Sequence, residues 1–321
     1  MIDKITLVKN NITVSEKLQV IEKNNLQCFI NESSNLKIYD NAKSKNLTGG
    51  ILIKIYNDNL KIEGSVHKYF NYLQFGTLEN YTVFTMSDFS KTIEILFENF
   101  GLTGIDFLLT NYEIGLNIYI ETGEPLDYLK KVISIGNLDG NQRKIYTNPK
   151  YKNERFLCTQ MHKDNTVVYR IYDKNFERLD KGKKSIIKPC IRIETLRTRQ
   201  KKLSFSEFIK PSNLLLLQNR FFAEWSTLNF DKEVSAPAGT HQNKKDLAKQ
   251  IIISGTKTVL KDLEEKRNQI TPKILRTKKE FLKSWETQKV NFVLIDCEIM
   301  PKWAKSYTTA IQLVTQNGVK I

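Results

Sequence analysis

Four short segments of this chain alternate apolar and polar side chains residue by residue, and this pattern constrains the fold more than any other feature. They span residues 60–67, 110–120, 166–174 and 190–197. Because side chains two residues apart on a β-strand share a face, each segment predicts a strand with one apolar face and one polar face. Strands of this kind are typical of an antiparallel sheet that buries one side against helices.

Segments with helical spacing separate these strands. Apolar residues recur every three or four positions over residues 89–100, after Ser87 or Asp88, and either of these two residues can cap a helix. Pro125 is expected near the start of a second helix, and Gly136 is expected to end it.

Further strands are predicted toward the N-terminus. Residues 1–39 show partial alternation and predict two or three strands, and Asn57-Asp58-Asn59 is typical of a hairpin turn between two more. The order of elements predicts an α+β fold, with a largely antiparallel sheet and helices packed on one face.

The length of 321 residues suits about two domains. Residues 1–205 are expected to form the α+β domain, with the N-terminal strands in residues 1–50. Residues 206–321 are expected to form a mainly helical C-terminal region, with a polar linker near 233–245.

The net charge of +15 and the isoelectric point near 9.4 favour a polyanionic partner, either nucleic acid or an anionic membrane surface. No apolar run is long enough to span a membrane, and the first residues, MIDKITLVKNN, lack the apolar centre of a secretory signal. The cysteines form no CxxC pair, which argues against a zinc site or a disulfide framework; they are Cys28, Cys158, Cys190 and Cys297. We therefore expect a cytoplasmic protein that binds nucleic acid and no membrane.

The polar faces of the four predicted strands gather ionisable side chains. Strand by strand, they are Glu63 and His67, then Glu113, then Arg170, Tyr172 and Lys174, and finally Arg192 and Glu194. One interpretation is that these residues simply lie on the solvated side of an antiparallel sheet, because such sheets alternate apolar and polar side chains. The functional interpretation has three parts: a metal site, a nucleophile and a set of phosphate-binding cations.

The acidic side chains are candidate metal ligands. Hard divalent ions such as Mg²⁺ and Mn²⁺ take oxygen ligands, often only a few of them from the protein. We expect Glu63, Glu113 and Glu194 to hold such an ion together with His67. A bound ion would polarise the phosphate oxygens as a Lewis acid.

Tyr172 is the candidate nucleophile. Its hydroxyl has an ordinary pKa of about 10, so it needs nearby cations or a base to attack at neutral pH. Arg170, Lys174 and Arg192 are expected to bind the scissile phosphate and counter the charge of the transition state. Tyr169 is a second candidate, but strand alternation places it on the opposite face from Tyr172, which favours Tyr172.

A basic stretch surrounds the last two predicted strands. The cations expected to contact nucleic acid are Arg170, Lys183, Lys184, Lys188, Arg192 and Arg197. A charge run is often only a solvated connector, but this one lies beside the candidate nucleophile, where a phosphate backbone would have to pass.

Five segments, in this order along the chain, resemble phage and plasmid replication initiators of the gene II/X type. They are KIYNDNLKIEGSVHKYFN, YTVFTMSDFSKTIEILFENF, NYEIGLNI, VVYRIYDKNFE and CIRIETLR. The resemblance covers residues 50–205 and extends to rolling-circle Rep proteins of the HUH-like nicking endonuclease superfamily. It implies a palm-like antiparallel sheet carrying a tyrosine nucleophile, with Tyr172 followed two residues later by Lys174.

The resemblance also implies an activity. Such an enzyme nicks origin DNA, single-stranded or supercoiled, by metal-dependent tyrosine transesterification, and leaves a 5′-phosphotyrosyl link and a free 3′-hydroxyl for rolling-circle replication. The sequence departs from the family pattern because the His-hydrophobic-His metal motif of many rolling-circle enzymes is absent, and His67 is the one histidine near the predicted ligands.

Two other functions stay open at this point. The chain could be a DNA-binding replication initiator or regulator without catalysis, with Tyr172 and the carboxylates on a solvent face. A structural or membrane-surface protein is disfavoured because no hydrophobic anchor is present. The helical C-terminal region could contact a host helicase or other replication proteins, grip duplex DNA, or complete the core.

Overall fold

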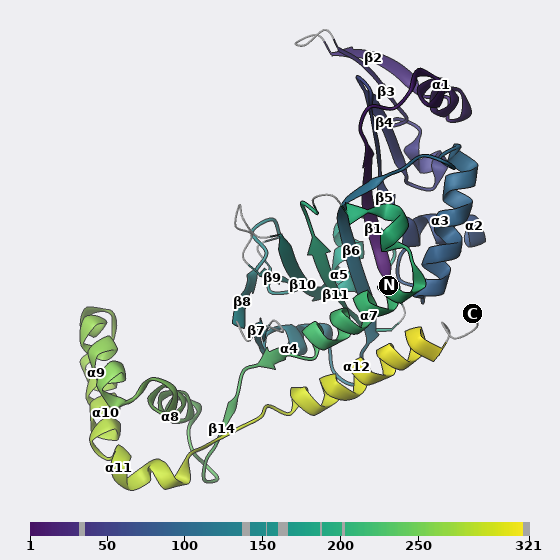
Figure 1. Ribbon diagram of the computed structural model, residues 1–321. Helices are drawn as coiled ribbons and strands as arrows, with labels where there is room; N and C mark the ends of the chain where they lie inside the picture. The colour runs from purple at the N-terminus through teal and green to yellow at the C-terminus, as the bar shows by residue number, and fades with distance from the viewer. Residues whose placement is uncertain are drawn as a thin grey trace. The chain divides into compact units, whose positions relative to one another are not determined.

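The computed structural model describes residues 1–31, 36–136, 142–151, 153–159, 166–186, 188–200 and 203–316 (Figure 1). The chain forms two compact units. The first contains residues 1–229 and 302–321, and the second contains residues 230–301. No helix in the described ranges is long and apolar enough to cross a membrane.

One large sheet organises the first unit (Figure 1). Its strands lie in the order β13 (Leu228–Phe230), β7 (Val132–Gly136), β8 (Gln142–Thr147), β9 (Phe156–Thr159), β10 (Val167–Asp173), β11 (Cys190–Arg197), β6 (Leu108–Tyr119), β1 (Ile2–Lys9), β5 (Asn59–Ser65), β4 (Leu52–Tyr56), β3 (Leu36–Asp40) and β2 (Gln27–Asn31), and β12 (Leu203–Ser204) also pairs with β6. The central pairings, from β10 through β11, β6 and β1 to β5, are all antiparallel. The predicted α+β fold with a largely antiparallel sheet is confirmed.

The register of the central strands aligns their polar residues. In the β10–β11 pair, Arg170 lies opposite Glu194 and Tyr172 lies opposite Arg192. In the β11–β6 pair, Glu194 lies opposite Gly115. Directly paired residues share a face of the sheet, so the predicted polar faces of β10 and β11 combine into one surface.

The opposite face of these strands belongs to the core. Ile171, Ile191 and Ile193 are fully buried there. Trp225, the last residue of α7 (Pro211–Trp225), donates its indole N–H to Thr195 of β11 at 3.0 Å. α7 therefore covers this part of the sheet, as the predicted burial of one face requires.

Helix α3 (Met86–Phe100) begins one or two residues before the predicted capping residues. Its cap is Thr85, whose hydroxyl accepts the Asp88 N–H at 3.1 Å while the Asp88 carboxylate accepts the Thr85 N–H at 2.9 Å. Asp88 is thus the return partner of a capping box rather than the cap itself. Gly101 ends α3 in the left-handed conformation, with a φ of 65°. Gly76 ends α2 (Val66–Phe75) in the same way, with a φ of 67°.

Other local predictions need correction. The N-terminal segment contains a helix, α1 (Val14–Lys23), between β1 and β2, because Thr13 and Glu16 form a capping box that the strand assignment overlooked. The helix that starts at Pro125 is the short α4 (Pro125–Leu129), and the residues expected to continue it form strand β7. The hairpin turn between β4 and β5 is confirmed, and Asn57 adopts a positive φ of 51° there.

Two candidate site residues lie on helices rather than strands. Strand β10 ends at Asp173, whose carboxylate accepts the N–H groups of Asn175 and Phe176 and caps α5 (Lys174–Asp180). Lys174 is therefore the first residue of a helix and not a member of the strand face. His67 likewise lies in the first turn of α2.

The chain divides later than the expected boundary after residue 205. Helices α6 (Phe205–Phe208) and α7 belong to the first unit, because Phe205, Phe208, Phe221 and Trp225 are buried in its core. Most of the last helix, α12 (Ile299–Gln316), also lies in the first unit, where Tyr307 donates its hydroxyl to the Phe222 carbonyl at 2.9 Å.

The second unit is mainly helical, with its own apolar core. It contains α8 (Gln242–Ser254), α9 (Thr256–Glu265), α10 (Pro272–Lys283) and α11 (Trp285–Gln288), beside a small antiparallel pair of β14 (Glu233–Ser235) and β15 (Val293–Ile295). Its core consists of Val234, Leu247, Ala248, Ile251, Val259, Leu263, Phe281, Trp285 and Phe292. The segment 233–245, expected to be a linker, contains β14 and the start of α8.

Candidate active site

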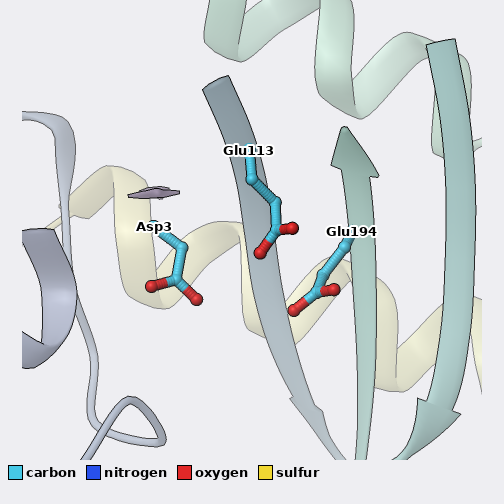
Figure 2. Close-up of side chains that lie close together, drawn as sticks. All are labelled: Asp3, Glu113 and Glu194. Carbon is cyan, nitrogen blue, oxygen red and sulfur yellow. The ribbon is translucent and has the colours of Figure 1, made fainter. Parts of the chain in front are cut away.

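Three buried carboxylates from three adjacent strands converge on the polar face of the sheet (Figure 2). Asp3 comes from β1, Glu113 from β6 and Glu194 from β11, and each offers one oxygen within 4.8 Å of the others. Strands β1, β6 and β11 are neighbours in the sheet, so their pairing brings together residues far apart in the sequence. We call these three residues the carboxylate cluster.

Two arginines hold the carboxylate cluster in place. Arg192 is fully buried; its Nε lies 2.7 Å from Glu194 Oε1, and its Nη2 pairs with Asp3. Arg170 is partly exposed, and its Nη1 lies 3.0 Å from Glu113 Oε2 and 3.7 Å from Glu194 Oε2. Buried charges persist when they are paired and hydrogen-bonded, and this arrangement meets that condition.

Gly115 explains how a guanidinium fits beneath strand β6. A Cβ atom at this position would overlap the Arg192 side chain, and only glycine lacks one. The Arg192 Nη1 then reaches Asn117 Oδ1 at 2.9 Å. Glycine in a strand often marks such a close approach.

If all three of its members were ionised, the carboxylate cluster would carry one more negative charge than Arg170 and Arg192 neutralise. Burial, and then repulsion from Glu194 and Asp3, raises the pKa of Glu113 to about 8. Burial alone would also raise the pKa of Asp3, but the Arg192 charge holds it well below its ordinary value. Convergent oxygen ligands with excess negative charge are the donor set that a hard divalent cation prefers, so these three residues fit such an ion.

Tyr172 is joined directly to the carboxylate cluster. Its hydroxyl donates to Glu194 Oε1 at 2.7 Å, and its ring stacks on Phe156 with centroids 4.4 Å apart. The side chain is 4% exposed. Burial, and then the Glu194 charge, raises the Tyr172 pKa well above its ordinary value, so the hydroxyl is protonated at neutral pH.

Tyr169 lies on the opposite face, as strand alternation predicts. Its ring packs edge-on against Trp225 of α7, with centroids 5.8 Å apart. Burial, and then the Glu224 charge, raises its pKa to about 12. Tyr169 therefore belongs to the helix-covered core, away from the carboxylate cluster.

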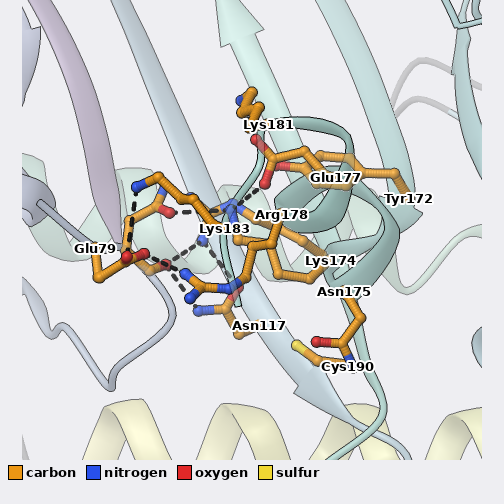
Figure 3. A network of polar contacts seen from close by, with 12 residues as sticks. Glu79, Asn117, Tyr172, Lys174, Asn175, Glu177, Arg178, Lys181, Lys183 and Cys190 are labelled. Atoms are coloured by element: carbon orange, nitrogen blue, oxygen red, sulfur yellow. Dashed lines mark hydrogen bonds and ion pairs between the residues drawn. The ribbon is translucent and has the colours of Figure 1, made fainter. Parts of the chain in front are cut away.

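Lys174 reaches the same region from the start of α5 (Figure 3). Its Nζ donates to Glu177 Oε2 at 2.8 Å and to Asn80 Oδ1 at 3.0 Å, and it lies 5.8 Å from the centre of the Tyr172 ring. Asn80 also donates its amide to Asp3 Oδ2 at 2.8 Å. This amide thus links Lys174 to the carboxylate cluster.

Glu63 and His67, the other two predicted ligands, lie outside the carboxylate cluster. Glu63 pairs with Lys4 and Lys61, each at 2.7 Å; burial would raise its pKa, but these lysines lower it to about 2. The His67 Nε2 lies 2.9 Å from Thr82 Oγ1, and burial holds the pKa of this ring well below its ordinary value. Asp3 takes the position expected for Glu63, because the strand next to β6 is β1 and not β5.

The predicted nucleic-acid contacts separate into three groups. Arg170 and Arg192 point into the carboxylate cluster. Arg197 does not face it, since it is buried and ion-paired with Glu224 of α7. The remaining three are Lys183, which is partly exposed, and Lys184 and Lys188, which are exposed.

Three residues of the site were not predicted from the sequence: Asp3, Asn80 and Glu177. Asp3 is followed by a second polar residue, Lys4, and the β1–β6 pairing shifts register between Ile2 and Lys4, so simple alternation does not place Asp3 on the polar face. Asn80 and Glu177 gave no signal either, since Asn80 lies in the irregular segment before α3 and Glu177, the last residue of VVYRIYDKNFE, lies on α5 and not on a predicted strand.

No protein-family model matches the chain, and no curated protein matches it in sequence. Among solved structures, the chain is similar to one described as "Structure of Rolling Circle Replication Initiator Protein from Geobacillus stearothermophilus". The identity is 10%, the match covers 76% of this chain and 89% of that chain, and the TM-score is 0.38. A TM-score this low transfers neither a fold nor a function to this chain.

Proposed function

We propose that this protein initiates rolling-circle DNA replication by nicking origin DNA with Tyr172. The observation that carries the proposal is the 2.7 Å hydrogen bond from the Tyr172 hydroxyl to Glu194, a member of the carboxylate cluster. A nucleophile, an acceptor for its proton and ligands suited to a divalent ion thus lie together. The ordered resemblance of five segments to replication initiators supports the same conclusion.

The proposed reaction is a transesterification in two reversible steps. The Tyr172 oxygen attacks the phosphorus while its proton passes to Glu194. The bond from phosphorus to the 3′-oxygen breaks and that oxygen takes a proton from water, which leaves a 5′-phosphotyrosyl link and a free 3′-hydroxyl. Mg²⁺ or Mn²⁺ held by Asp3, Glu113 and Glu194 would supply Lewis-acid polarisation of the phosphate oxygens.

The neighbouring cations have separate tasks in this proposal. Arg170 is the more exposed of the two arginines and is the one that can turn toward a phosphate. Arg192 is fully buried and keeps Asp3 and Glu194 in position. Lys174, over the Tyr172 ring, stabilises negative charge that develops on the tyrosine oxygen.

One observation favours a second candidate, a replication initiator that binds DNA without cutting it. Tyr172 is 4% exposed, so a DNA strand reaches its hydroxyl only after the surrounding side chains move. In a protein without catalysis, Tyr172 would serve as a buried hydrogen-bond donor to Glu194. The two candidates differ in whether a covalent intermediate forms.

Covalent adduct formation tests the proposal. The full chain is incubated with a pool of single-stranded DNA of random sequence, labelled at the 3′ end, in Mg²⁺ or Mn²⁺ and separately in EDTA. The label stays with a 5′-phosphotyrosyl fragment, so a nicked strand appears as a labelled protein band on a denaturing gel. We expect this band with either ion and not in EDTA.

Substitutions of the two tyrosines identify the nucleophile. Tyr172→Phe should abolish the adduct, whereas Tyr169→Phe, the matched control on the opposite face, should retain it. Loss in Tyr169→Phe alone would move the nucleophile to that residue. Absence of any adduct, on this pool and on supercoiled DNA, would favour the second candidate.

A further inference from the structure

Lys181 and Lys183 lie near Lys174 and Glu177 (Figure 3). Lys181 pairs with Glu177, and Lys183 lies 3.4 Å from Glu79. Lys68, in the first turn of α2, is affected by the same charges: burial lowers its pKa, Asp3 raises it, and Lys181 and Lys183 lower it. We call Lys68, Lys181 and Lys183 the lysine cluster.

Among the residues that the structure describes, no carboxylate pairs with the lysine cluster alone. Glu177 is shared with Lys174, whose side chain is 3% exposed, and Glu79 is shared with Arg178, whose side chain is 7% exposed. These two buried cations already balance the two carboxylates. The charge of Asp3 also reaches Lys68, but Asp3 is paired with Arg192.

Three ammonium groups therefore remain in excess at one place on the surface. The side chains of Lys181 and Lys183 are 48% and 35% exposed, so both can reach a ligand from solution. Like charges held together repel one another, and a bound anion would relieve that repulsion. Two of these lysines are held by hydrogen bonds. The Lys68 N–H donates to Ser65, which caps α2, and Lys183 Nζ donates to the Leu78 carbonyl at 3.0 Å.

We propose that Lys68, Lys181 and Lys183 bind backbone phosphates of a single DNA strand beside the Tyr172 site. This inference rests on the proposed function for its ligand, and it adds a binding site outside the carboxylate cluster. Ammonium groups are point charges without a fixed hydrogen-bonding fork, so they suit phosphates of any sequence. The site would hold the strand in register, and base identity would be read elsewhere.

The charge distribution favours nucleic acid over other anions. The protein has a net charge of +15, which raises the concentration of a polyanion near its surface. A strand with regularly spaced phosphates can contact three cations, one from α2 and two from the segment that follows α5. A small anion would have to bind all three ammonium groups at a single point.

Salt-dependent binding tests this inference without any chemistry. The full chain is titrated into fluorescein-labelled dT₃₀ in EDTA, and the dissociation constant is measured by anisotropy across salt concentrations. Each single-strand phosphate contact contributes about 0.7 to the slope of log K against log salt. We expect Lys68→Gln, Lys181→Gln and Lys183→Gln each to lower the slope by about 0.7 and to weaken binding roughly fivefold at 0.1 M salt.

Three controls keep the outcome decisive. Lys91→Gln, at an exposed position on α3, removes the same charge and should leave the slope unchanged. Lys68→Arg should retain the slope, and thermal melting checks that each variant is folded. Equal slopes in the three cluster variants and in Lys91→Gln would overturn the inference.

The two proposals can fail separately. A reduced slope in the cluster variants, without a Tyr172 adduct in Mg²⁺ or Mn²⁺, would support the phosphate site and overturn the nicking function. An adduct that depends on Tyr172, with unchanged slopes, would support nicking and overturn the phosphate site.

Discussion

At the scale of single residues, Glu194 contacts both the two arginines of the site and the candidate nucleophile. Its Oε1 accepts hydrogen bonds from Tyr172 and from Arg192, both at 2.7 Å, and its Oε2 lies 3.7 Å from Arg170. Glu194 is thus both an anchor of the buried polar network and the acceptor closest to the candidate nucleophile.

Glu113 differs from Glu194 because its charge is less well neutralised, and this difference predicts how metal binding depends on pH. Its pKa is raised to about 8, so at neutral pH it is mostly protonated in the metal-free protein, and a bound cation must displace that proton. Mn²⁺ affinity should therefore rise about tenfold per pH unit from pH 6 toward about 8 and then level off. Isothermal titration calorimetry across this pH range measures the effect.

Two variants test whether Glu113 causes the pH dependence of Mn²⁺ binding. Glu113→Gln should bind Mn²⁺ weakly and lose the pH dependence, because it has no proton to displace. Glu63→Gln is the matched control, since Glu63 pairs with Lys4 and Lys61 outside the carboxylate cluster, and it should keep the wild-type slope. Affinity that stays constant over this range would contradict the role given to Glu113.

At the scale of secondary-structure elements, the junction of β10 and α5 sets the position of Lys174. Asp173 ends the strand and accepts the N–H groups of Asn175 and Phe176, and it also pairs with Arg155 at 2.7 Å. The change from strand to helix at this residue turns Lys174 back over the Tyr172 ring. The cap therefore determines the position of a candidate catalytic side chain as well as the start of the helix.

Removing this cap should affect both stability and adduct formation. Asp173→Ala loses the cap and the ion pair, which should lower the free energy of unfolding by about 2 kcal/mol. Thr13→Ala at α1 is the matched control, because it also removes a capping-box residue and should cost about 1 kcal/mol. Urea unfolding measures both costs. The adduct yield should fall in Asp173→Ala alone; equal yields in the two variants would show that the junction does not position Lys174.

At the scale of the whole molecule, the protein combines a sheet-based unit that carries the candidate site with a smaller helical unit that has a core of its own. Phe281 packs against Trp285 and Phe292 within the second unit, at ring centroid distances of 5.9 and 5.6 Å. Among the described residues, the buried members of the apolar core around these rings lie between residues 234 and 292. We therefore expect the second unit to lose stability without a change in the packing of the first.

A cavity in the second core tests this independence. Phe281→Ala should destabilise the second unit by about 3 to 4 kcal/mol. Hydrogen exchange followed by peptide mass spectrometry should then show faster exchange in residues 242–292, with unchanged protection of β6, β10 and β11. The Tyr172 adduct should form at the wild-type level. Loss of protection in the central strands would show that the two units unfold as one.

The sequence by itself determined the class of fold and much of the polar face of the sheet. Alternation identified β6, β10 and β11 and separated Tyr172 from Tyr169, because the side-chain period of a strand is a local property of the backbone. Local propensity also predicted a helical C-terminal region, although the second unit begins at residue 230 and not at 206. Net charge favours a polyanionic partner, which stays a prediction.

The tertiary structure alone decided which strands are neighbours, and with that the membership of the carboxylate cluster. Asp3 replaced Glu63 as the third carboxylate because β1 lies between β6 and β5, and the order of strands in a sheet depends on contacts between distant segments. The lysine cluster arose in the same way, from helix α2 and the segment that follows α5, which are separated by about a hundred residues. Side-chain period and charge are properties of single segments of the sequence, whereas a site forms only where packing brings distant segments together.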